Sequence, residues 1–169
     1  FKMAGSAILR GSHGIWVVVV SFLIVAFLLV MPLPEWLEYY RPEWMALAVI
    51  YWVMALPNRI GLLSAWVLGF FVDVLEDSLL GLNGLVLALV AYMTLSLYQR
   101  LRMFTMLQQA STVFMLIGLH QLVSFWVLTV SNQTTSPNLM FLVSALSSAI
   151  VWPLVFYILR YLRRSFRVV

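Results

Sequence analysis

The strongest constraint in this sequence is a series of long apolar stretches, the first of which covers residues 15–31 and contains no charged side chain. An α-helix needs about 17 to 25 apolar residues to cross the hydrocarbon core of a bilayer. The chain has 64% hydrophobic and 9% charged residues, whereas soluble domains average about 25% charged residues. The sequence therefore predicts an integral membrane protein.

Turn residues and charges divide the chain into six apolar segments, each of which we expect to be a transmembrane helix. The second and third are short, because Pro57, Asn58 and Arg59 form a turn between them; each covers only about 20 to 25 Å of a core about 30 Å thick. A re-entrant hairpin is the alternative for this pair, and a signal peptide is the alternative for the first segment. We predict a single all-α membrane domain over residues 1–169, with spans at about residues 15–31, 42–56, 60–75, 79–98, 106–130 and 139–159.

The distribution of charge supports six spans. Of the ten Lys and Arg residues, only Arg41 then falls on the same side as the six Asp and Glu residues. Cytoplasmic loops carry an excess of Lys and Arg, so both termini are expected in the cytoplasm. A re-entrant hairpin would leave Arg59 unpaired at mid-depth, which is costly. The formal charge of +4 is thus explained by topology, and no nucleic-acid partner is predicted.

The stretch GFFVDVLEDSLLGLNGL, residues 69–85, is the first place to look for a functional site, because acids within or beside a bilayer are costly to keep. Gly69 and Asp73 lie one helical turn apart, and a glycine on that face permits close approach of another helix. Asp73 is either held in such a packed junction or solvated at the external interface, while Glu76 and Asp77 are expected in an external turn. A turn and a helix start are indicated by Gly81, Asn83 and Gly84.

Other polar residues have ordinary structural interpretations beside functional ones. Arg41, next to Pro42, is the one basic residue on the acidic side, and we hypothesise that it pairs with Glu43, Asp73 or Glu76. Pro57 and Arg59 indicate a cytoplasmic turn with a topological anchor. The C-terminal arginines are expected to rest on anionic lipid headgroups.

Catalysis has no clear basis in these residues. The chain has no cysteine, which excludes a thiolate nucleophile and a cysteine metal site. His120 and Ser124 lie one turn apart in an apolar segment, where a hydrogen bond between helices is a commoner role than proton transfer. We predict no enzyme activity, no catalytic residues, no metal and no cofactor.

The order of several motifs resembles the MreD family of rod shape-determining membrane proteins. The resemblance is carried by RPEWMALAVIYWVMALPNRIG at residues 41–61 and by GFFVDVLEDSLLGLNGL at residues 69–85. Its specific positions are Arg41, Pro42, Pro57, Arg59, Gly69 and Asp73, followed by the Leu-Gly-x-x-Gly run at residues 80–84.

The resemblance implies a non-enzymatic scaffold in the bacterial inner membrane, as a component of the cell-elongation (Rod) complex. Such a protein binds MreC and helps couple the MreB filament to peptidoglycan synthesis by RodA and its class B transpeptidase. The resemblance also implies a fold similar to the S components of energy-coupling-factor transporters. The alternative function is therefore that of a small-molecule-binding membrane subunit.

Overall fold

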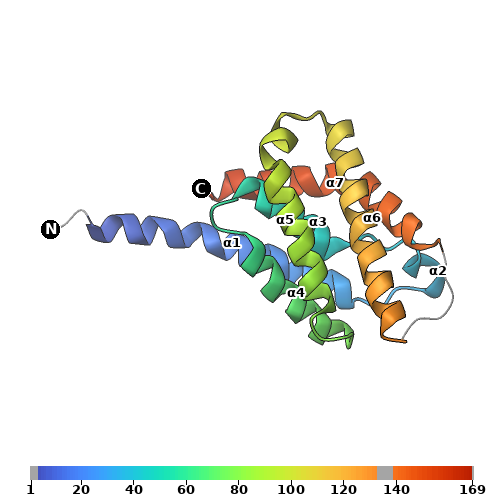
Figure 1. The fold of residues 1–169 in the computed structure, drawn as a ribbon. Helices are drawn as coiled ribbons and strands as arrows, with labels where there is room; N and C mark the ends of the chain where they lie inside the picture. The colour runs from blue at the N-terminus through green and yellow to red at the C-terminus, as the bar shows by residue number, and fades with distance from the viewer. Residues whose placement is uncertain (1–3, 133–138, 169) are drawn as a thin grey trace.

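The computed structural model describes residues 4–132 and 139–168, and within these ranges every regular element is a helix. Figure 1 shows the arrangement. The elements are α1 (Ala4–Val30), α2 (Glu35–Glu38), α3 (Trp44–Ala55), α4 (Leu62–Glu76), α5 (Leu82–Met103), α6 (Met106–Val130) and α7 (Phe141–Ser165). The predicted all-α class is confirmed.

Three of these helices, α5, α6 and α7, are long and apolar enough to cross a membrane. Two shorter apolar helices are Gly14–Val30, which is part of α1, and Trp44–Ala55. The short second and third segments of the sequence form α3, with 12 residues, and α4, with 15 residues. A helix of 12 residues is about 18 Å long, so α3 is shorter than the hydrocarbon core.

Several helix boundaries differ from the expected spans. Both α5 and α7 extend past their predicted ends, through Arg100 and Arg102 in one and through Arg163 and Arg164 in the other. Arginine is a good helix former and is favoured near a helix C-terminus, so the helices continue where the apolar runs stop. The four-residue α2 was not predicted, and α3 begins after Pro42 rather than at it.

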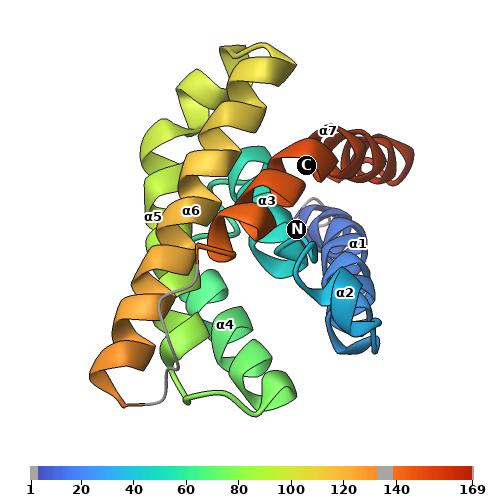
Figure 2. The same cartoon turned by 90° about the vertical axis from the view of Figure 1, so that its right-hand side faces the viewer.

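The central element is α3, in which every residue from Met45 to Ala55 is buried. Figure 2 shows α3 between α5 and α6 on one side and α1 and α7 on the other. A helix that is apolar all round can be stable only where neighbours cover all of its faces. α4 packs mainly against α5 and makes few contacts with α1.

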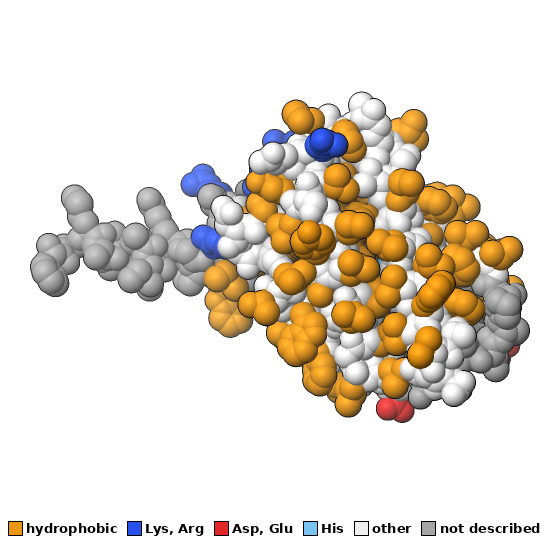
Figure 3. All heavy atoms as spheres, in the orientation of Figure 1, with side chains coloured by type: hydrophobic (Ala, Val, Ile, Leu, Met, Phe, Trp, Pro, Cys, Tyr) orange, Lys and Arg blue, Asp and Glu red, His pale blue; other side chains and the backbone are white. Residues whose placement is uncertain are grey.

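The charged side chains lie at opposite ends of the bundle, as Figure 3 shows for one face. We call one end the acidic end, and it carries Arg41 together with Glu35, Glu38, Glu43, Asp73, Glu76 and Asp77. We call the other the basic end, and it carries Arg59, Arg100, Arg102, Arg160, Arg163, Arg164 and Arg167. The alternation seen in the sequence is therefore a separation in space.

Candidate functional site

Asp73 is completely buried in the last turn of α4 and accepts three hydrogen bonds. Its Oδ1 accepts from the Ser78 hydroxyl at 2.8 Å and from the Asn83 backbone N–H at 3.0 Å, and its Oδ2 accepts from the Gly81 backbone N–H at 2.8 Å. The two N–H groups belong to the start of α5, where a negative charge is favourable. Asp73 therefore acts as an N-terminal cap for a helix other than its own.

Gly69 and Gly84 allow α4 and α5 to touch through their backbones. A Cβ atom on Gly69 would lie 2.3 Å from the Asn83 carbonyl oxygen and 2.5 Å from the Gly84 Cα. A Cβ on Gly84 would lie 3.3 Å from the Trp66 carbonyl oxygen. The close approach expected at Gly69 is thus present, and it is what brings the Asp73 carboxylate within reach of the α5 amides.

The turn between α4 and α5 contains two residues in the left-handed region, Asp77 at φ 51° and Gly81 at φ 93°. Asp and Gly are the residue types that adopt this conformation at low cost. Glu76 and Asp77 are both exposed, and the Asn83 amide donates to Glu76 Oε2 at 3.3 Å. The structure therefore separates the three acids, with one buried in the junction and two at its surface.

A second group of polar contacts holds the segment that precedes α3. Ser144 donates to the Arg41 carbonyl at 2.8 Å, and the Glu43 N–H donates to the Ser148 hydroxyl at 3.0 Å. Gln121 on α6 donates to the Glu43 carboxylate. Polar side chains of α6 and α7 thus hold the chain that leads into α3.

The Arg41 side chain does not form the ion pair that we hypothesised. Its Nη2 donates to the Leu28 carbonyl at 2.7 Å, and no carboxylate within the described residues forms an ion pair with it. Three buried atoms near this level have no hydrogen-bond partner in the described part of the chain, namely Arg41 Nε, His120 Nδ1 and Ser124 Oγ. His120 and Ser124 lie within three residues of Gln121 on α6, and the Gln121 amide donates to Glu43.

Arg102 makes a contact that sequence reasoning missed. Its Nε and Nη2 donate to the Met54 carbonyl at 3.1 Å and 2.9 Å, and Nη2 also donates to the Ala55 carbonyl at 3.2 Å. These carbonyls belong to the last turn of α3, which needs outside donors. The arginine pattern predicted a topology signal, but its helix-capping role depends on the placement of α3.

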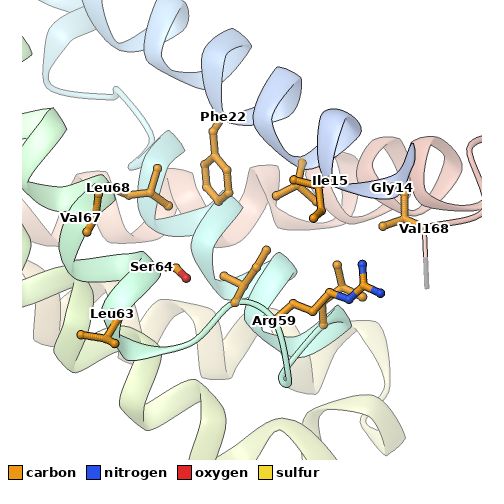
Figure 4. A pocket seen from close by; sticks show the side chains of 12 residues that line it. Gly14, Ile15, Phe22, Arg59, Leu63, Ser64, Val67, Leu68 and Val168 are labelled. Atoms are coloured by element: carbon orange, nitrogen blue, oxygen red, sulfur yellow. The ribbon is translucent and has the colours of Figure 1, made fainter. Parts of the chain in front are cut away.

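An apolar groove of about 960 Å³ separates α1 from α4 towards the basic end (Figure 4). Phe22 of α1 and Leu56 and Ile60 of the α3–α4 turn line it, together with Leu63, Val67 and Leu68 of α4. Arg59 and Ser64 are its polar lining residues. The predicted turn at Pro57 and Arg59 is present, and it places Arg59 at this groove.

These arrangements are suited to holding helices together and to presenting surfaces. Within the described residues, no group of three or more His, Cys, Asp or Glu side chains is placed to hold a metal ion. The Asp73 carboxylate is occupied by backbone and hydroxyl donors, and His120 has no carboxylate or hydroxyl bonded to it among the described contacts. Among the hydrogen bonds of the described residues, none joins a hydroxyl group to a histidine.

Comparison with known proteins gives a consistent result. The family model for the rod shape-determining protein MreD matches residues 10–162. The Rod shape-determining protein MreD of Haemophilus influenzae is 30% identical over 151 residues, which cover 89% of this chain and 93% of that protein. No solved structure matches.

Proposed function

This chain belongs to the MreD family of rod shape-determining proteins, and from that premise we propose that it is a non-enzymatic scaffold of the cell-elongation machinery. Membership of the family gives it a role in cell shape. In the proposal it lies in the bacterial inner membrane and binds MreC. Through MreC it helps couple MreB to the synthase formed by RodA and its class B transpeptidase.

We further propose a topology of six spans with both termini in the cytoplasm. The spans are α1 and α3 to α7, so the short α3 and α4 are included. The separation of an acidic from a basic end supports this orientation, since basic loops remain in the cytoplasm. Glu76 and Asp77 then face the periplasm, where the chain that follows the MreC span would also lie.

The proposed binding surface for MreC rests on one observation, the exposed apolar face of α4. Leu63, Val67, Phe70 and Val74 follow one another at helical spacing and are 79%, 59%, 42% and 60% exposed. We call these four residues the α4 stripe. At one end the stripe borders the groove beside α1, and at the other it approaches the exposed Glu76 and Asp77.

A transmembrane helix is a better occupant of this surface than lipid chains alone. α4 has 15 residues, which gives it a length of about 22 Å against a hydrocarbon core of about 30 Å. A neighbouring helix of full length can shield the ends of a short helix from the lipid. Its side chains also pack against a concave surface better than mobile acyl chains do. We therefore place the MreC span along the α4 stripe and its periplasmic continuation at the α4–α5 turn.

Site-specific photo-crosslinking in cells tests this placement. A crosslinker at Val67, Phe70 or Asp77 is expected to capture MreC. Met115 on α6 is 74% exposed and serves as the matched control, because it also faces outward from an apolar helix. Capture at Met115 as strong as at Val67, or no capture at the α4 positions, would contradict the placement.

One observation favours the alternative of a small-molecule-binding subunit. The unpartnered Arg41 Nε, His120 Nδ1 and Ser124 Oγ are buried polar atoms, and buried polar groups normally have partners. A bound small molecule would provide hydrogen-bond partners for these three atoms. Mass spectrometry of the purified protein separates the two functions, since a ligand-binding subunit retains a stoichiometric small molecule while a scaffold retains MreC.

A further inference from the structure

A pocket at the basic end contains three arginines from two helices. It has a volume of about 350 Å³ and lies among α3, α5, α6 and α7. Arg102 of α5 and Arg160 and Arg163 of α7 line it, with Tyr51 and Gln109 as further polar lining residues. We propose that this pocket binds a phosphate group, a role that does not depend on the scaffold function proposed above.

The three guanidinium groups are held in place by contacts that leave donors available. Arg102 uses its Nε and Nη2 on the end of α3, and Arg163 donates from Nε to the Val168 carbonyl at 3.5 Å. Arg160 lies over the Phe156 ring, with its Cζ 5.8 Å from the centroid. An arginine has five N–H donors, so each of the three retains some for a ligand.

The positive charge around the pocket favours binding of an anion. All six Asp and Glu side chains belong to the acidic end, so three positive charges gather here without a carboxylate side chain among the lining residues. A phosphate group carries up to two negative charges and presents oxygens in several directions, which suits guanidinium groups that approach from different helices. A carboxylate has two oxygens in one plane and fits this arrangement less well.

The phosphate can come from the headgroup of an anionic lipid or from a soluble phosphate compound. Two measurements on the full chain in a neutral detergent distinguish the sources. Native mass spectrometry compares retention of phosphatidylglycerol with that of phosphatidylcholine, and thermal unfolding is followed during titration with inorganic phosphate.

The test variant is Arg160→Gln with Arg163→Gln, and the control is Arg164→Gln with Arg167→Gln. Both remove two charges from the end of the same chain, but the control residues do not line the pocket. We expect the test variant to weaken binding by about tenfold or more, while the control retains it. If the double variant fails to fold, the same binding measurements are made on Arg160→Gln alone. This variant removes the Arg160 contact with the Phe156 ring on its own helix.

Each outcome decides the proposal. Retention of phosphatidylglycerol that is lost only in the test variant supports the lipid source, and stabilisation by inorganic phosphate that is lost only there supports the soluble source. An equal loss in the test and control variants would show attraction to net charge and overturn the pocket. Equal retention of both lipids together with no effect of phosphate would also overturn it.

Discussion

The two sides of α4 differ sharply. On the side of α5, the backbones meet at Gly69 and Gly84, and the Asp73 carboxylate closes the junction with three hydrogen bonds. On the side of α1, an apolar groove of about 960 Å³ keeps the helices apart. We call these the closed side and the open side. The same short helix is thus fixed by one neighbour and left uncovered towards another.

This difference separates residues that build the fold from residues that present a surface. Substitutions on the closed side should reduce the free energy of unfolding, because they disturb backbone contacts or buried polar groups. Substitutions on the open side should leave stability almost unchanged and affect association. The following variants test that division, with stability measured by SDS-induced unfolding of the purified chain in mixed micelles.

The largest loss is expected for Gly69→Ala. The new methyl group would lie 2.3 Å from the Asn83 carbonyl oxygen, so the α4 and α5 backbones must separate, at a cost of about 3 kcal/mol. Gly118→Ala on α6 is the matched control, because a Cβ there meets nothing within 4 Å. It should gain up to about 1 kcal/mol from helix propensity. Equal stability of the two variants would refute the backbone contact.

Asp73→Ala is expected to lower the free energy of unfolding by about 2 to 3 kcal/mol. It leaves the Gly81 and Asn83 amides without the acceptor that caps α5, and an unsatisfied buried donor is costly. Asp77→Asn is the control, since Asp77 is exposed and Asn also tolerates its positive φ. A change below about 0.5 kcal/mol for Asp73→Ala would mean that the turn holds without the carboxylate.

Arg102→Gln should have a smaller effect, about 1 to 2 kcal/mol, through the loss of its hydrogen bonds to the end of α3. Arg102 is exposed, and this exposure moderates the cost. Arg100→Gln removes the same charge two residues away on an exposed position and should change stability by less than about 0.5 kcal/mol. Similar effects of both variants would show that charge, rather than capping of α3, is responsible.

The closed side could be predicted from the sequence because the residue types that it requires stand close together in the chain. Close backbone contact requires glycine, and an acid next to an apolar run needs a specific reason to be there. Gly69 and Asp73 share a helix face at a spacing that can be read directly. Whether Asp73 was buried or solvated stayed open, since that depends on where the Gly81 and Asn83 amides lie in space.

Other contacts leave no such local signal. Gln121, Ser144 and Ser148 are separated from Arg41 and Glu43 by about half the chain, so their hydrogen bonds depend on how α6 and α7 cross α3. The hydroxyl contacts of Ser144 with Arg41 and of Ser148 with Glu43 were therefore not predicted. Within the described residues Arg41 forms no ion pair with a carboxylate, and its Nη2 donates to the Leu28 carbonyl.

The open side should tolerate a large side chain that the closed side cannot. Val67→Trp enlarges a residue that is 59% exposed on the α4 stripe, so the free energy of unfolding should change by less than about 0.5 kcal/mol. If the stripe holds MreC, the same substitution should reduce MreC co-purification several-fold, because the new indole occupies the partner's position. Met115→Trp on α6 adds the same side chain at a comparable exposed site and should leave both stability and co-purification unchanged. A large loss of stability in Val67→Trp would mean that this face of α4 is packed within the fold, and the distinction between the two sides would then be wrong.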